Sequence, residues 1–321
     1  MSLVILDERS DKNNRVGVVM LVTDGVYSRK AAMYPIRPEI LKKYPVHTFG
    51  ICAHDPNVLL SIAQQSCGTY SFVDDNELGN IADPFSILLG GLTSIVAVDV
   101  LVRIACNSSW RSSLKLIRCG FQSSEITQPP SRGGGVTMAE IGIGMLYDGE
   151  VKNIIADVVI DPDTSGTRTR VEISMQYRDA PGGSSINGDG HVGHRSTGKQ
   201  AGDSGDNSSM VRGQEVQFNA LEFLSPLQDE FRKQMSTAGA KGENEARAAQ
   251  IRAGNPGEEK EVQEMVNRLK QGAGMAYMCS WVSSKQMQRA ATLGSVDAVG
   301  TQFFTPAMDA MLSETKKYHV Q

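Results

Sequence analysis

The chain has 321 residues, which is enough for two or three domains that each bury a core of their own. Its 32 Lys and Arg residues against 36 Asp and Glu residues give a net charge of −4, with both signs interspersed. Because no large positive field results, we expect neither nucleic acid nor an anionic membrane surface as a partner.

Cysteine usage and the first residues indicate an intracellular protein. The cysteines are widely spaced without any Cys-x-x-Cys pair; they are Cys52, Cys67, Cys106, Cys119 and Cys279. This pattern favours reduced thiols over a disulfide framework or a structural zinc site. Charged residues follow Met1 almost at once, so no secretory leader is recognised. The most apolar window, 86–106, contains Asp99 and Arg103 and is a poor membrane span, so we expect a soluble protein of the cytoplasm or another intracellular compartment.

Residues 1–98 alternate between apolar strands and helical stretches. A near-continuous apolar run at 16–22 predicts a strand covered on both faces. Shorter runs at 46–52 and 69–73 predict two more strands. Because helical stretches follow the second and the third strand, the order predicts an α/β region with a Rossmann-like parallel sheet.

The first predicted helix has recognisable ends. Asp55 fits an N-cap and Pro56 the first helical position, and the helical pattern continues to about Gln65. Gly68 stands where a glycine commonly ends a helix. A second helix is expected at about 78–92, after the third strand.

Residues 99–179 contain candidate strands without a helical pattern. Turn sequences such as Asp148-Gly149 and Asp161-Pro162 separate them. The candidate strands lie at 98–105, 113–119, 141–147, 151–160 and 170–177. Short strands at this spacing predict a small antiparallel β-sandwich.

The remainder divides into a polar segment and a helical region. Residues 180–213 are rich in Gly, Ser, Asp and Asn and predict a flexible linker, in which His191 and His194 offer at most an adventitious metal site. Residues 214–321 show apolar stripes at helical spacing and predict a helical domain. The stripes are Phe218, Leu221, Leu224, Leu227 and Phe231, then Val262, Met265, Val266 and Leu269, and finally Met308, Met311 and Leu312.

Catalytic motifs are not found, and one carboxylate stands out. The glycine run 133–135 lacks the Lys-Ser/Thr of a phosphate-binding loop, and neither Gly-x-Ser-x-Gly nor His-Glu-x-x-His occurs. We therefore expect neither enzymatic activity nor a cofactor. Asp24 follows the strand predicted at 16–22, at the carboxyl end where open α/β sheets bind ligands. Its carboxylate could bind Mg²⁺, and it could equally cap the Thr23-Asp24-Gly25 loop.

Several segments together resemble one family. Residues 18–25, Val-Val-Met-Leu-Val-Thr-Asp-Gly, resemble the fourth strand and third metal-site motif of von Willebrand factor A domains. Residues 45–51, 68–73 and 90–92 continue the likeness. In the order of its regions, the chain is similar to plant proteins that join a RING finger, an A domain, a β-rich segment and a helical tail. The resemblance is strongest over 16–106.

This resemblance implies that residues 1–98 are the C-terminal half of an A domain. The family's adhesion-site metal also needs an Asp-x-Ser-x-Ser loop and a Thr from earlier in the domain, and only Asp24 can be carried over to this sequence. Mg²⁺ binding to Asp24 alone is expected to be no tighter than about millimolar. We suspect a truncated product, in which the strand at 16–22 lacks a neighbour. Its unpaired edge then favours self-association or pairing with a partner.

The sequence leads to three hypotheses about function. The first is a non-enzymatic protein–protein interaction module of von Willebrand A type. The alternative is the substrate-recognition part of a ubiquitin ligase whose RING is absent from this chain, since no Cys/His array of a RING occurs here. The third is a non-functional remnant. In the first two, the partners are other proteins.

Overall fold

The computed structural model describes the chain in segments that form two compact units. The described residues are 6, 16–25, 41, 44–74, 78–79, 81–108, 113–120, 123–127, 135–159, 170–180, 197–200, 214–215, 218, 221, 274–294 and 303–319. Unit 1 comprises Met1–Ser94, Gly149–Val151 and Val216–Gln321, and unit 2 comprises Ile95–Asp148 and Lys152–Glu215. A parallel sheet with helices in unit 1 and antiparallel sheets in unit 2 confirm the predicted combination of an α/β region and an antiparallel β region.

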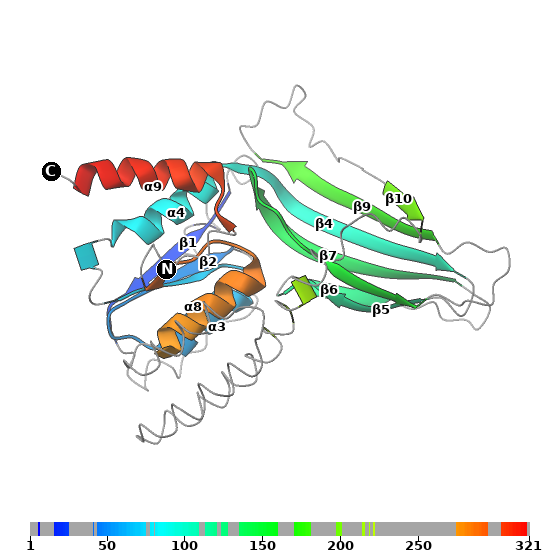
Figure 1. Ribbon diagram of the computed structural model, residues 1–321, viewed down its shortest axis with the longest axis horizontal. Helices are drawn as coiled ribbons and strands as arrows, with labels where there is room; N and C mark the ends of the chain where they lie inside the picture. Colours follow the sequence, from blue (N-terminus) through cyan, green and yellow to red (C-terminus); the bar gives the residue numbers. More distant parts are fainter. Residues whose placement is uncertain are drawn as a thin grey trace, which may run out of the picture. The chain divides into compact units, whose positions relative to one another are not determined.

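Unit 1 is built on a parallel sheet in the strand order β1-β2-β3-β11 (Figure 1). The strands are β1 (Val19–Thr23), β2 (Val46–Ile51), β3 (Tyr70–Val73) and β11 (Leu293–Gly294). The first three match the strands predicted from apolar runs. β11 was not predicted, because two residues are too few to show a periodic pattern.

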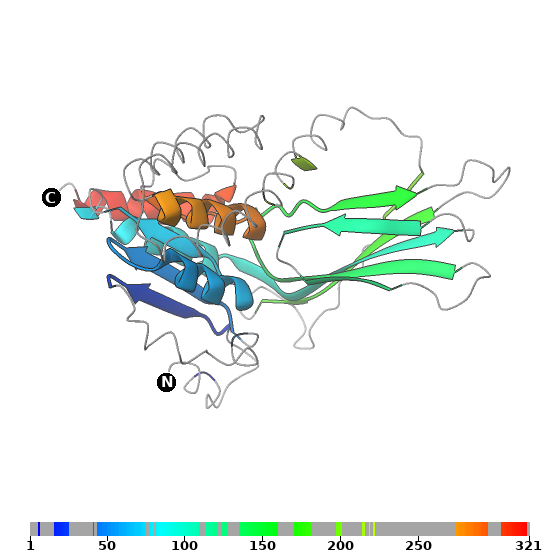
Figure 2. The same cartoon turned by 90° about the horizontal axis from the view of Figure 1, so that it is seen from below.

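Helices cover both faces of this sheet. They are α3 (Pro56–Gln65), α4 (Ala82–Thr93), α8 (Gly274–Met287) and α9 (Pro306–His319). The ring centroids of Phe49 in β2 and Phe85 in α4 lie 4.6 Å apart. The hydroxyl of the neighbouring Thr48 donates to Leu59 O of α3 at 3.0 Å. Because neighbouring residues of a strand point to opposite faces, α3 and α4 lie on opposite sides of the sheet. Figure 2 shows the same layers turned by 90°.

The C-terminal helices do not form the separate domain predicted at 214–321. The described residues from 216 onward belong to unit 1, because β11 pairs with β3 and α8 packs against α3 and β3. Ser283 Oγ accepts from the Tyr70 N–H at 2.8 Å, and Ser280 Oγ donates to Tyr70 O at 3.2 Å. The apolar stripes therefore reflect docking onto the sheet. Phe218, Leu221, Met308 and Leu312 are buried as predicted, whereas Leu224, Leu227, Phe231 and the stripe at 262–269 lie outside the described residues.

The ends of α3 confirm one prediction and correct another. Asp55 caps the helix, since its Oδ1 accepts from the N–H groups of Asn57 and Val58 at 3.1 and 3.4 Å. At the other end Cys67, and not Gly68, adopts the left-handed conformation, with φ 58°. The Gly68 N–H donates to Ala63 O at 2.8 Å, which completes a Schellman motif. Gly68 is required for a different reason: a Cβ there would lie 2.0 Å from Val46 O.

Unit 2 is built from antiparallel sheets, as predicted. Its larger sheet has the order β10-β9-β4-β7-β6 and its smaller sheet pairs β5 with β8. The strands are β4 (Ile95–Ser108), β5 (Ser113–Arg118), β6 (Ser123–Thr127), β7 (Gly135–Tyr147), β8 (Ile155–Val159), β9 (Arg170–Asp179) and β10 (Thr197–Gln200). Inward residues such as Ile104 and Ile141 of the larger sheet share one core with Leu114 and Ile117 of β5. Alternating inward apolar residues on both sheets explain this core.

The linker prediction for 180–213 is wrong for its described part. Residues 197–200 form β10, with Thr197 opposite Ile173 and Gln200 opposite Arg170 of β9. The segment was misjudged because edge pairing uses backbone groups and needs no apolar side chain. His191 and His194 lie outside the described residues.

The contact between α4 and α9 predicts a specific sensitivity. A Cβ on Gly90 would lie 2.7 Å from Ala307 O and from Met308 Cα. Gly90→Ala should therefore push α9 from α4 and lower the free energy of unfolding by about 1–3 kcal/mol. Gly79→Ala is the matched control, since nothing lies within 4 Å of a Cβ there. Urea unfolding of both variants measures the effect. Equal stabilities would show that the packing of α9 does not depend on the close approach of Gly90 to Ala307 and Met308.

Candidate functional site

The outer edge of β1 is the first candidate. In the described part of the chain β1 pairs with β2 alone, from Val19 opposite Val46 to Thr23 opposite Gly50. Its other edge has no strand partner among those residues. Figure 2 shows β1 at the margin of the parallel sheet. A row of backbone N–H and C=O groups is thus presented along this edge.

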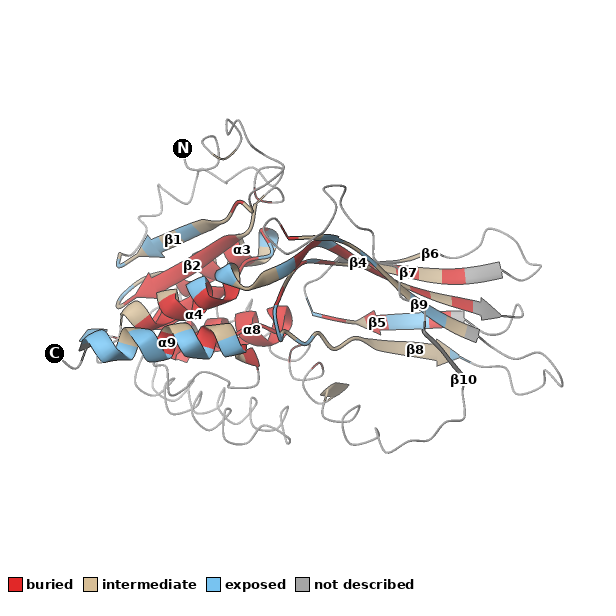
Figure 3. Cartoon of the chain, turned by 90° about the horizontal axis from the view of Figure 1, so that it is seen from above, coloured by how far each residue is buried: buried red, intermediate tan, exposed pale blue. Residues whose placement is uncertain are grey.

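Exposed apolar side chains accompany this edge. All of β2 is buried, whereas Met20 and Val22 of β1 are 43% and 46% exposed (Figure 3). Met20 and Val22 of β1 are paired with His47 and Phe49 of β2, and paired residues lie on the same face of a sheet. On β2 this face is covered by α4, whose Phe85 contacts Phe49. The prediction that this strand is covered on both faces is therefore wrong for the described residues. A continuous apolar run cannot tell whether a helix reaches the strand.

Asp24 lies at the carboxyl end of β1 and is exposed. The preceding Thr23 hydroxyl accepts from the Gly25 N–H at 3.3 Å, which shapes the turn. Asp74 follows β3 and therefore also lies at the carboxyl ends of the parallel strands. It is buried, and its N–H donates to Gly294 O at 3.0 Å. Within the described ranges, no group of three or more His, Cys, Asp or Glu side chains could hold a metal ion. Asp24 as a Mg²⁺ ligand stays a prediction.

His54, after β2, is a residue that sequence reasoning missed. Its ring fills the space above Gly50, where a Cβ would lie 2.1 Å from His54 Nε2. Nδ1 lies 2.8 Å from Cys52 O, which can only accept, so we assign the proton to Nδ1. Nε2 then accepts from the Tyr70 hydroxyl at 2.5 Å. A glycine inside a strand is the sequence signal for such a close approach.

The groups around His54 hold the loop in place. Burial raises the pKa of Tyr70 well above its usual value, with smaller contributions from Cys279 and Asp55. Burial likewise raises the pKa of the Cys279 thiol, again with a contribution from Asp55. Because the thiolate is the nucleophile, this burial works against reaction at Cys279. His54 thus connects β3 to the loop that leads into the Asp55 cap.

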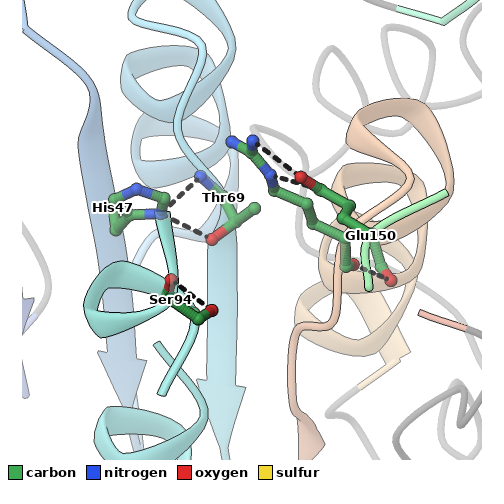
Figure 4. A network of polar contacts seen from close by, with 7 residues as sticks. His47, Thr69, Ser94 and Glu150 are labelled. Atoms are coloured by element: carbon green, nitrogen blue, oxygen red, sulfur yellow. Dashed lines mark hydrogen bonds and ion pairs between the residues drawn. The ribbon is translucent and has the colours of Figure 1, made fainter. Parts of the chain in front are cut away.

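A second buried polar group lies at the opposite end of β2 (Figure 4). His47 Nδ1 accepts from the Thr69 N–H at 3.2 Å and lies 2.8 Å from the Thr69 hydroxyl. Its Nε2 is buried without a hydrogen-bond partner among the described residues. Burial, and secondly the charge of Arg289, lower the pKa of His47 to about 3. The imidazole is therefore neutral in the folded protein.

Arg289 and Glu150 form a buried ion pair in unit 1 (Figure 4). Arg289 Nε and Nη2 donate to the two Glu150 carboxylate oxygens at 2.7 and 3.3 Å, with the side chains 4% and 2% exposed. Arg289 lies two residues after the end of α8. Its N–H donates to Ser284 O at 3.1 Å, and the intervening Gln288 has φ 48°. A cation at a helix C-terminus is favourable. The pair anchors the segment Gly149–Val151 to unit 1.

His47 predicts a dependence of stability on pH. Its folded pKa of about 3 lies below the unfolded value of 6.5, so between these values the unfolded chain binds more protons. Its contribution to stability is complete above pH 6.5 and declines as the pH falls, by up to about 1.4 kcal/mol per pH unit. His47→Asn keeps an acceptor for Thr69 and does not titrate. Urea unfolding from pH 7.5 to 4.5 should give a steeper loss for the wild type, and parallel profiles would contradict this role.

The Arg289–Glu150 pair predicts non-additive substitutions. Arg289→Met leaves a buried carboxylate without its ion-pair partner and should cost about 3–5 kcal/mol. Adding Glu150→Gln should recover part of that loss. Arg103→Met is the control, because Arg103 and Glu140 form an ion pair in unit 2 whose side chains are 38% and 41% exposed and which should contribute under about 1 kcal/mol. Denaturant unfolding measures these proteins together with Glu150→Gln alone, which completes the double-mutant cycle. Additive effects at Arg289 and Glu150 would argue against a coupled pair.

The chain has little detectable similarity to known proteins. No protein-family model and no curated protein matches the chain. Among solved structures, it is similar to the human COPII-coat protein Sec24c, with 11% sequence identity and a TM-score of 0.38. The similarity covers 76% of this chain and 34% of the Sec24c chain, so this chain spans about a third of that protein. A likeness at this level shows no family, and the von Willebrand A and RING-family resemblances stay predictions from sequence.

Proposed function

We propose that this chain is a non-enzymatic protein-interaction module whose unit 1 carries a von Willebrand A-type sheet, and that the outer edge of β1 binds the partner. The observation that carries the proposal is the exposure of Met20 and Val22 on a strand whose outer edge has no pairing in the described part of the chain. Other proteins are the partners of such a surface. No helix among the described residues combines the length and apolar character that a membrane span requires.

Strand addition is the mode of binding that suits this edge. A partner strand would bond the N–H and C=O groups on the outer edge of β1, which has no strand partner in the described ranges. Its alternate side chains would pack against Met20 and Val22. Natural proteins protect sheet edges with charged residues or proline, and the β1 sequence Val-Met-Leu-Val-Thr has neither. At the opposite side of the sheet, β11 pairs with the edge of β3. β11 is the other edge strand of this sheet, and it is two residues long against five for β1.

The family resemblance supports the same surface. A von Willebrand A sheet usually has six strands, and in that family a central strand from the first half of the domain would pair with β1. The proposal therefore assigns to a partner the position that a further strand takes in the family. Asp24, at the end of this edge, would be a weak Mg²⁺ ligand in the same proposal. The ubiquitin-ligase alternative stays a hypothesis from sequence, since no observation in the structure favours it.

Peptide selection tests the proposal. Extended peptides of about twelve residues, displayed on phage, are selected on the immobilised full chain. We expect enrichment of peptides with alternating apolar residues, because these complement both the backbone and Met20 and Val22. Their affinity should fall at least tenfold on Val22→Lys, since a lysine on an edge strand opposes further pairing.

The control is Val159→Lys, because Val159 of β8 in unit 2 is 45% exposed and matches Val22 at 46% in residue type and exposure. Peptides that lose affinity for the Val22 variant and keep it for the Val159 variant support the β1 edge. Failure to enrich any peptide, or equal loss on both variants, would refute it.

A further inference from the structure

We infer that the strand received by β1 is β1 of a second copy, paired antiparallel and centred on Leu21. This inference rests on the proposed function, because it names the partner of the same edge. It would join two parallel sheets into one continuous sheet across a two-fold axis. Its basis is the self-complementarity of five residues, Val19 to Thr23.

The side chains of β1 are matched to their own copy in this register. An antiparallel pair centred on Leu21 places Met20 opposite Val22 of the second copy, and Val19 opposite its Thr23. Directly opposite residues share a face of the sheet. The four exposed apolar side chains, two from each copy, would therefore cover one another, and all five residues of each β1 would be paired.

Two constraints exclude the neighbouring registers. A shift by one residue would bring opposite faces of the two sheets together, which a two-fold axis across an antiparallel pair does not allow. A shift by two residues in one direction places Met20 opposite the exposed Asp24 of the second copy. In the other direction it places Val22 opposite Val18, outside β1. The register centred on Leu21 is the one that uses the whole strand.

Charge also favours the antiparallel arrangement. β1 itself carries no charge, and Asp24 follows it directly. Antiparallel pairing places Asp24 opposite Val18, so the two Asp24 carboxylates lie at opposite ends, about 20 Å apart at about 3.3 Å per residue. Parallel pairing would bring the two carboxylates to the same end, where they would repel.

The surface area buried between the two strands sets the expected affinity of the dimer. A pair of five-residue strands buries less than the roughly 1,000 Å² of a stable interface. The dimer should therefore be weak, with a dissociation constant on the order of 10–100 μM. Sedimentation of the full chain from 1 to 500 μM should show reversible dimerisation. Val22→Lys should weaken it at least tenfold, and Val159→Lys should leave it unchanged.

Disulfide trapping tests the register. The background carries Cys52→Ser and Cys67→Ser, because these are the two cysteines that are not buried. In the predicted register the two Leu21 Cα atoms lie about 4.5–5.5 Å apart, within the range of about 4.4–6.8 Å that a disulfide needs. Leu21→Cys should therefore give a cross-linked dimer under mild oxidation. Val19→Cys is the matched control, since its two Cα atoms would lie about 13 Å apart and cannot be bridged.

The outcomes separate this inference from the proposed function. Cross-linking through position 21 and not 19, lost when Val22→Lys is added, supports the self-paired strand. Equal cross-linking at both positions, or a wild-type chain that stays monomeric at 500 μM, overturns it. If the chain stays monomeric while peptides are still selected through Val22, the edge binds another protein and the proposed function stands. If both experiments fail, both proposals are wrong.

Discussion

The hydrogen bonds along the two edges of the parallel sheet are the constraint on which unit 1 depends. On one side, the chain returns after more than two hundred residues to pair β11 with β3, with the Phe72 N–H donating to Thr292 O at 3.0 Å and the Asp74 N–H to Gly294 O at 3.0 Å. On the other side, β1 is the opposite edge strand and pairs with β2. Since an unpaired edge invites another strand, we propose the outer edge of β1, with its exposed Met20 and Val22, as the binding surface of unit 1.

The pairing of β11 with β3 depends on the position of α8, which precedes β11 in the chain. Buried polar groups fix that position. Ser280 and Ser283 bond the backbone of Tyr70, and Arg289 at the end of α8 pairs with Glu150. Buried ion pairs add little net stability compared with apolar packing, but breaking one is costly. We therefore regard Arg289 and Glu150 as groups that define where α8 ends. His54 serves a similar purpose at the other end of β2, where it connects a loop to Tyr70.

A binding role that depends on backbone pairing makes modest demands on side chains. Strand addition obtains its affinity from main-chain hydrogen bonds and its selectivity from alternate side chains. In the proposed pairing, Met20 and Val22 on the exposed face of β1 would supply that selectivity. This explains how an interaction surface can exist without the polar clusters that mark catalytic or metal sites.

The sequence by itself determined the features that depend on neighbours in the chain. Apolar runs located β1, β2 and β3, Asp55 and Pro56 marked the start of α3, and turn residues separated the strands of unit 2, because these patterns report local backbone preference. The same run at 16–22 placed Asp24 at the end of a strand, and the family resemblance implied an unpaired edge for that strand. Only the tertiary structure decided which face of β1 is exposed, why Gly68 and Gly50 must be glycine, and where α8, β11 and α9 belong. Each of these depends on atoms brought together from distant positions, such as Ser283 and Tyr70, and no local pattern encodes such a contact.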